Sequence, residues 1–135
     1  MTMDLQIKKF LSSAAFAVAG ASSNREKYGN MVVRCYQQQG KVVIPVHPLE
    51  KEIEGLACVA SVADLPPEVK SLSMITPPAV TEKIVVAAIA HGIENIWMQP
   101  GASSPAAVEL CQANGVNVIA DGSCVLVVLG FHGGH

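Results

Sequence analysis

A glycine-bounded loop at residues 20–29, with the sequence GASSNREKYG, is the segment of this chain best equipped to bind an anion. It leads from a short apolar run into a stretch of helical spacing, so its backbone amides and the positive end of that helix could hold a diphosphate. Ser22, Ser23 and Asn24 add side-chain donors. The spacing is not G-x-G-x-x-G, however, and a glycine turn with only a structural role stays open as the alternative.

A second informative position follows the next apolar run, which ends in the sequence PVHP at residues 45–48. Proteins that bind nicotinamide dinucleotides usually carry an aspartate or glutamate here, where it holds the ribose hydroxyls. This chain instead has His47, with Lys51 nearby, and these side chains would tolerate a phosphate on the ribose. The loop therefore favours a phosphorylated adenosine over NAD, with an ordinary surface histidine as the alternative.

Three further loops carry rigid or reactive residues. Pro77 and Pro78 would form a stiff apolar wall against which an adenine or a pantetheine arm could lie, or would simply stiffen the chain. Asp121 has no second carboxylate beside it, and Cys124 has no partnered base, so a small buried thiol is favoured over a nucleophile. Walker A, G-x-S-x-G and metal-helix patterns are missing from the sequence, and we predict no catalytic or metal site.

The elements that position these loops alternate between apolar runs and stretches of helical spacing. The expected strands are residues 14–19, 42–46, 71–75, 94–98 and 116–120. The expected helices are residues 4–11, 30–39, 81–91 and a segment capped by Ser103 or Ser104, with one helical turn at residues 61–65. Strands that are apolar on both faces are typical of parallel sheets covered by helices. The sequence thus predicts one α/β domain over residues 1–135, with an open, mostly parallel five-stranded sheet and helices on both faces.

In such a sheet, ligands collect beyond the carboxyl ends of the strands, at the point where the strand order reverses. All the candidate residues fall in loops that follow an expected strand: residues 20–29, 47–51, 76–79, 99–103 and 121–124. We therefore expect them to lie along one edge of the sheet.

Composition and charge exclude several classes of protein. A chain of 135 residues with 50% apolar and 15% charged residues has the size and composition of one domain with a real core. The net charge of −2 gives no field that would gather nucleic acid or an anionic membrane. No apolar stretch approaches the roughly 18 to 20 residues of a membrane helix. We expect neither a nucleic-acid partner nor a membrane span.

The cysteines favour a reducing, cytoplasmic location. They form no C-x-x-C pair and have apolar neighbours, at positions 35, 58, 111 and 124. This pattern suits buried thiols better than disulfides or zinc, and His132 and His135 lack a third metal ligand. The N-terminus imitates a secretory signal, but Asp4 precedes the lysines and two serines interrupt the apolar run.

Taken in order, the loop sequences resemble the CoA-binding domain family of small Rossmann-like proteins. The resemblance rests on the motifs GASSNREKYGN, VIPVHP, ADLP, TPPA, GIENIWMQPGA and DGSC. It runs from about Ala14 to Cys124, and the same family is similar to the N-terminal domain of the succinyl-CoA synthetase α-subunit. The ordered set is far more specific than any single motif.

The resemblance implies a Rossmann-like domain that binds coenzyme A, an acyl-CoA or a related nucleotide. The matching positions are Gly20, Ala21, Ser22, Tyr28 and Gly29 in the phosphate turn, His47 and Pro48 after the second strand, Pro77 and Pro78 in the apolar wall, and Gln99 and Gly101 after the fourth strand. Lys51 is a weaker candidate for the 3′-phosphate. The chain departs from the family at His47, where asparagine is frequent, and in its divergent hydrophobic and glycine-rich tail over residues 125–135, which could be an edge strand or a dimer contact.

We expect a binding module without catalysis of its own. The synthetase acts through a second domain with a phosphorylated histidine and through a partner subunit, and 135 residues hold neither. One alternative is an NAD(P)-linked oxidoreductase or a partner subunit of an acyl-CoA ligase, whose general acid or base would be Asp121, Cys124 or His47. Another is an interaction protein that has lost the ligand. A homo-oligomer and a protein partner both stay open.

Overall fold

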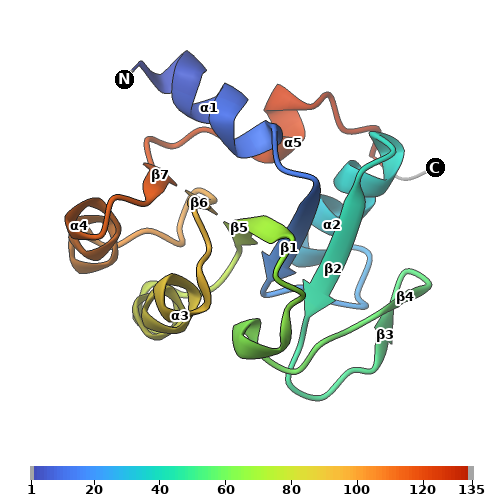
Figure 1. Ribbon diagram of the computed structural model, residues 1–135. Helices are drawn as coiled ribbons and strands as arrows, with labels where there is room; N and C mark the ends of the chain where they lie inside the picture. The colour runs from blue at the N-terminus through green and yellow to red at the C-terminus, as the bar shows by residue number, and fades with distance from the viewer. Residues whose placement is uncertain (1, 134–135) are drawn as a thin grey trace.

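A parallel sheet of five strands organises the computed structural model, which describes residues 2–133 (Figure 1). Its strands are β1 (Ala15–Ala19), β2 (Val42–Val46), β5 (Val69–Met74), β6 (Asn95–Met98) and β7 (Asn117–Ile119). They are arranged in the order β2-β1-β5-β6-β7, and each neighbouring pair is parallel. The predicted α/β fold is confirmed.

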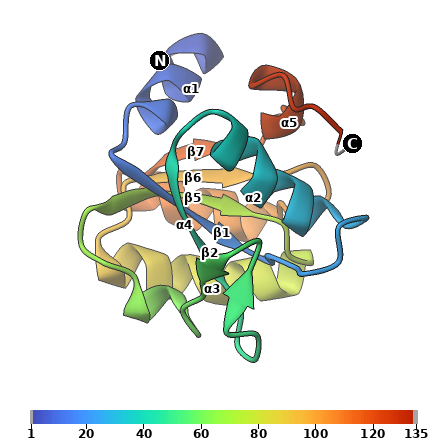
Figure 2. The same ribbon diagram turned by 90° about the vertical axis from the view of Figure 1, so that its right-hand side faces the viewer.

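Helices cover both faces of the sheet, as the apolar strands predict (Figure 2). One face carries α1 (Met3–Leu11), α2 (Tyr28–Gln38) and the short α5 (Val125–Val128). The other face carries α3 (Pro78–His91), α4 (Pro105–Ala113) and a single 3₁₀ turn, η1 (Val62–Asp64). No helix within residues 2–133 is both long enough and apolar enough to cross a membrane.

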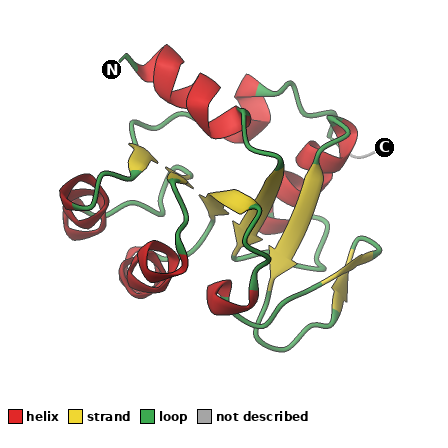
Figure 3. Cartoon of the chain, in the orientation of Figure 1, coloured by secondary structure: helices red, strands yellow, loops and turns green. Residues whose placement is uncertain are grey.

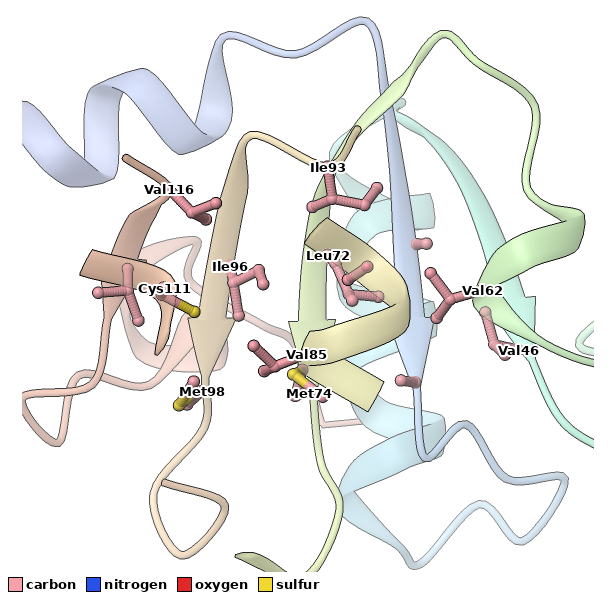
Figure 4. Close-up of a cluster of buried hydrophobic side chains, with 14 of the residues drawn as sticks. Val46, Val62, Leu72, Met74, Val85, Ile93, Ile96, Met98, Cys111 and Val116 are labelled. Carbon is pink, nitrogen blue, oxygen red and sulfur yellow. The ribbon is translucent and has the colours of Figure 1, made fainter. Parts of the chain in front are cut away.

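The two faces of β1 differ in side-chain size, and this difference shapes the site. Phe16 and Val18 point toward α2, where the Phe16 ring stacks on Tyr36 with ring centroids 4.9 Å apart. The opposite face of β1 presents only alanines, which pack in the cluster drawn in Figure 4 with aliphatic and sulfur-containing side chains of β5, β6, α3 and α4. The small side chain of Ala19 leaves space beside the carboxyl end of β1.

Three elements differ from the sequence-based expectation by more than two residues at either end. Helix α3 begins at Pro78 rather than Thr81, because proline is well tolerated in the first turn of a helix. The segment expected to be a plain loop after His47 contains a two-stranded hairpin, β3 (Glu52–Ile53) and β4 (Leu56–Ala57), visible in Figure 3. Residues 125–128 form helix α5 against α2 and not an edge strand.

The strand order reverses between β1 and β5. From β1 the chain passes through α2 to β2 on one side, and after β2 it crosses to β5 on the other side of β1. The loops that leave β1 and β5 therefore diverge to opposite faces, which opens a crevice between them. The fold places the candidate site at this edge.

Candidate functional site

Glycines at positions 20 and 29 allow the β1–α2 loop to lie against β5. Gly20 has a φ of +83°, and a Cβ atom there would stand 2.3 Å from the carbonyl oxygen of Ile75. Gly29, in the first turn of α2, approaches so closely that a Cβ atom would stand 2.0 Å from the carbonyl oxygen of Gly20. Only glycine fits these positions without a shift of the backbone, so the loop is held tightly over the end of the sheet.

The first hollow at this edge, which we call the loop cleft, has a volume of about 540 Å³. It is lined by Gly20, Ala21, Ser22, Glu26, Lys27, Tyr28, Gly29, His47 and Ile75. No side chain caps the N-terminus of α2, whose N-cap residue is Lys27. Uncapped amides and a lysine favour an anion here, whereas the Glu26 carboxylate opposes one.

The second hollow, which we call the apolar cleft, has a volume of about 460 Å³ and lies between the end of β1, η1 and α3. Its walls are mainly aliphatic, from Val46, Val62, Val80 and Ile84. Its polar side chains are His47, Ser61, Thr76 and Lys83. A flat ring system fits this chemistry, with a lysine and an imidazole to receive an anionic substituent.

His47 lines both the loop cleft and the apolar cleft. Its Nδ1 atom accepts hydrogen bonds from the backbone amides of Leu49, at 3.0 Å, and Glu50, at 2.9 Å. An Nδ1 atom that accepts carries no proton, so the ring proton resides on Nε2 and this atom is the donor available to a ligand.

The third hollow, which we call the thiol cleft, has a volume of about 300 Å³ and is lined by Tyr28, Ile75, Gln99, Pro100 and Cys124. Gln99 is buried and links two elements: its Nε2 donates to Cys124 Sγ at 3.2 Å, and its Oε1 accepts from the Val125 amide at 2.9 Å. Gln99 thus fixes Cys124 at the wall of this cleft.

The three clefts form one row along the edge, because neighbouring clefts share lining residues. Gly20, Ala21 and His47 line both the apolar cleft and the loop cleft. Tyr28 and Ile75 line both the loop cleft and the thiol cleft. An elongated ligand could therefore occupy all three.

The cysteines differ in their surroundings. Cys35 and Cys111 are fully buried, and burial raises the pKa of each thiol to about 11, with nearby Cys124 adding to the shift at Cys35. Burial and two neighbouring glutamates also raise the pKa of Cys58. Cys124 is half-buried. The expectation of buried thiols is confirmed for Cys35 and Cys111 and wrong for Cys58 and Cys124, which are half-buried, with Cys124 at the wall of the thiol cleft.

The structure brings together eight of the twelve residues that the sequence proposed. They are Gly20, Ala21, Ser22, Tyr28, Gly29, His47, Pro48 and Gln99, each lining at least one of the three clefts.

The other four residues line none of these three clefts. Pro77 and Pro78 are exposed and form the N-cap and first residue of α3, so the apolar wall consists of Val80 and Ile84 from the same helix. Gly101, with a φ of +91°, forms an exposed turn, and Lys51 is exposed at the start of the β3–β4 hairpin.

Sequence reasoning missed Lys27, Lys83 and the aliphatic face of α3. Val80, Ile84 and Ala87 have the spacing of one helical face, and Lys83 adjoins it. That spacing is visible in the sequence. Because α3 is largely apolar, however, the sequence does not show which of its faces lies at the carboxyl edge of the sheet.

The described part of the chain contains no group of three or more histidine, cysteine, aspartate or glutamate residues that could hold a metal ion. His132 is exposed, with its backbone amide bonded to Gln38, and His135 lies outside the described residues.

Solved structures share this architecture. A conserved hypothetical protein from Pyrococcus furiosus superimposes with a TM-score of 0.81 and 36% identity, covering 84% of this chain and 97% of that one. The dinucleotide-forming acetyl-coenzyme A synthetase 1 of Ca. Korarchaeum cryptofilum superimposes with a TM-score of 0.76, covering 86% of this chain and 27% of that one. At 20% identity, the second likeness shows the fold alone.

The amino-acid sequence is also similar to that of a ligase subunit and matches a family model. The chain is 27% identical over 88 residues to the acetate–CoA ligase [ADP-forming] II subunit alpha of Pyrococcus furiosus, a match that covers 64% of this chain. It spans only 19% of that relative. The model of the CoA binding domain family matches residues 14–129, which confirms the resemblance seen in the loop motifs. The chain belongs to the CoA binding domain family.

Proposed function

We propose that this protein binds coenzyme A, or an acyl-CoA or related nucleotide, at the carboxyl edge of its sheet, as a stand-alone module with no catalysis of its own. The observation that carries this proposal is the row of three clefts, whose chemistry follows the order of the parts of coenzyme A. That molecule consists of a phosphorylated adenosine, a diphosphate and a pantetheine arm that ends in a thiol. Membership of the CoA binding domain family supports the same ligand.

Each part of the ligand has a chemically suitable cleft. The loop cleft would hold the diphosphate through backbone amides of the Gly20 turn and the N-terminus of α2, with Lys27 beside them. The apolar cleft would hold the adenine between aliphatic walls, with His47 and Lys83 near the phosphate on the ribose. The pantetheine arm would then run toward the thiol cleft and Cys124.

The surroundings of two candidate acid–base groups, Asp121 and His47, support binding without catalysis. Asp121 is exposed, and hydrogen bonds from Ser123 hold the pKa of its carboxyl below the usual range. Asp121 is therefore ionised at neutral pH and cannot donate a proton there. His47 offers a ring donor, but its other nitrogen is bonded to two backbone amides.

A second candidate function is that of a nucleotide-binding partner in an acyl-CoA ligase. The match to an acetate–CoA ligase subunit favours it. This function would use the same clefts but would require another chain to supply the catalytic groups. We further propose a cytoplasmic location, since the cysteines are free thiols, which a reducing compartment preserves.

A thermal-shift titration against CoA, dephospho-CoA, NAD and NADP tests the proposal. A ligand at 100 times its dissociation constant stabilises the native state by about 2.7 kcal/mol, which raises the melting temperature by several degrees. We expect such a shift with CoA and a smaller one with dephospho-CoA. A shift with NAD alone would make an oxidoreductase the better assignment, and no shift with any of the four would favour an interaction protein.

Two lysine variants sharpen this test. Lys83→Ala is expected to reduce the difference between the shifts with CoA and with dephospho-CoA, because Lys83 lines the apolar cleft together with His47. Lys51→Ala removes the same charge from an exposed position outside the three clefts, so it should leave that difference in place. The opposite pattern would assign the 3′-phosphate to Lys51.

A further inference from the structure

The tip of the β3–β4 hairpin contains an unusual backbone conformation. Glu54 has a φ of +52°, and within residues 2–133 it is the one residue other than glycine with a positive φ. It is followed by Gly55, also with a positive φ, at +77°. A two-residue hairpin turn with two positive φ values favours asparagine, aspartate or glycine at its first position, so glutamate there is strained. Such strain persists only where surrounding contacts compensate for it.

The compensating contacts all lead to the β1–α2 loop and to α2. Oε2 of Glu54 accepts a hydrogen bond from Asn30 Nδ2 at 3.0 Å, and Oε1 lies 3.4 Å from Arg25 Nη1. The backbone carbonyl of Glu54 accepts from Gln37 Nε2 at 3.1 Å. Only 17% of the Glu54 side chain is exposed, so the ion pair with Arg25 is partly shielded from water on the Glu54 side.

Asn30 connects Glu54 to the loop of residues 20–29. It is fully buried, and its Nδ2 also donates to the carbonyl oxygen of Ser22 at 2.9 Å. Its Oδ1 accepts from Arg34 Nε at 2.7 Å, and Arg34 Nη2 donates to the carbonyl oxygen of Arg25 at 3.0 Å. One connected network therefore holds two carbonyl groups of the loop, those of Ser22 and Arg25.

This anchoring sets the direction of the loop's peptide groups. A trans peptide is planar, so a Ser22 carbonyl that points toward Asn30 turns the following amide the opposite way. The network engages the carbonyl groups of Ser22 and Arg25, and both Ser22 and Glu26, the residue after Arg25, line the loop cleft. A loop ordered in this way before binding loses less conformational entropy when a diphosphate arrives.

We infer that Glu54 is a positioning residue for the ligand: through Asn30 and Arg25 it holds the loop of residues 20–29 in its binding conformation. This inference rests on the proposed function, because it concerns affinity for the ligand of the loop cleft. Glu54 itself lies outside the three clefts.

The direction in which the affinity for CoA changes distinguishes a positioning role of Glu54 from a purely electrostatic one. Glu54 carries a negative charge, so its removal would strengthen the binding of an anionic ligand if charge alone mattered. A positioning role predicts the reverse. We expect Glu54→Gln, which loses the ion pair with Arg25 and offers Asn30 a weaker, neutral acceptor, to raise the dissociation constant of CoA several-fold, measured by isothermal titration calorimetry well below the melting temperature.

Glu52→Gln is the matched control. Glu52 belongs to the same hairpin and is exposed, and its replacement removes the same charge. We expect its dissociation constant for CoA to equal that of the wild type or to fall slightly. In hydrogen exchange of the free proteins, the amides of residues 22–26 should exchange faster in Glu54→Gln than in Glu52→Gln.

A third variant shows whether weaker binding results from the lost carboxylate or from impaired folding. Glu54→Gly relieves the strained φ while it removes the carboxylate, so it should fold at least as well as Glu54→Gln and still bind CoA weakly. Wild-type protein that fails to bind CoA would overturn the proposed function. Wild-type protein that binds CoA, together with Glu54→Gln and Glu54→Gly variants that both bind as tightly as Glu52→Gln, would overturn the positioning role alone.

Discussion

Replacement of Gly20 by alanine is expected to lower the free energy of unfolding by about 2 to 5 kcal/mol. A left-handed conformation costs an L-residue roughly 1 to 2 kcal/mol. The new Cβ atom would also stand 2.3 Å from the Ile75 carbonyl oxygen, and displacement of a packed backbone adds about 1 to 3 kcal/mol. Urea denaturation of the purified variant measures the loss.

Alanine variants at two other glycines measure the conformational cost and the steric cost separately. Gly40 has a φ of +68° with open space around it, so Gly40→Ala carries only the conformational cost, about 1 to 2 kcal/mol. Gly29 meets the Gly20 carbonyl without a φ in the left-handed region, so Gly29→Ala carries only the steric cost. If Gly20→Ala proved as stable as Gly40→Ala, the close approach of the loop to β5 would be wrong.

A negative charge placed in the loop cleft is expected to abolish most of the affinity for CoA. Ser22 lines this cleft, and its Oγ accepts only a local hydrogen bond from the Asn24 amide at 3.0 Å. A carboxylate at this position would repel both charges of a bound diphosphate by about 3 kcal/mol in total, or roughly a hundredfold in the dissociation constant. Calorimetric titration of Ser22→Glu with CoA tests this expectation.

Ser22→Gln provides the control, because it adds nearly the same volume and loses the same hydrogen bond without a charge. The weakening should be several-fold at most in this variant. Equal dissociation constants for the Ser22→Glu and Ser22→Gln proteins would show that no anion binds near residue 22.

Much of the fold follows directly from local patterns. The strand at residues 42–46 has the predicted bounds, and Ser104 caps α4 by accepting a hydrogen bond from the Ala107 amide. The hairpin was missed because its strands have two residues each, too few for an alternating pattern. Its position depends on the contact between Glu54 and Asn30, which are 24 residues apart in the sequence.

The site residues that lie in loops could be predicted from the sequence. Those that lie on the faces of helices could not. Gly20, Ser22 and His47 follow strands, and strand ends can be located from the sequence. Lys83 and Val80 reach the apolar cleft only because of the way α3 packs across the sheet. Pro77 and Pro78 illustrate the same point: they follow β5 in the sequence, but helix α3 starts there and leaves them exposed.

The most direct test of ligand binding at the carboxyl edge is amide chemical-shift mapping of the ¹⁵N-labelled protein during titration with CoA. The structure predicts saturable shifts in residues 20–22 and 26–29, at His47, at Ile75 and Thr76, and at Lys83, all of which line the clefts. Amides at the opposite edge, where β1, β5 and β6 begin, should be unaffected. Saturable shifts centred on that opposite edge, or no saturable shifts at all, would contradict this assignment.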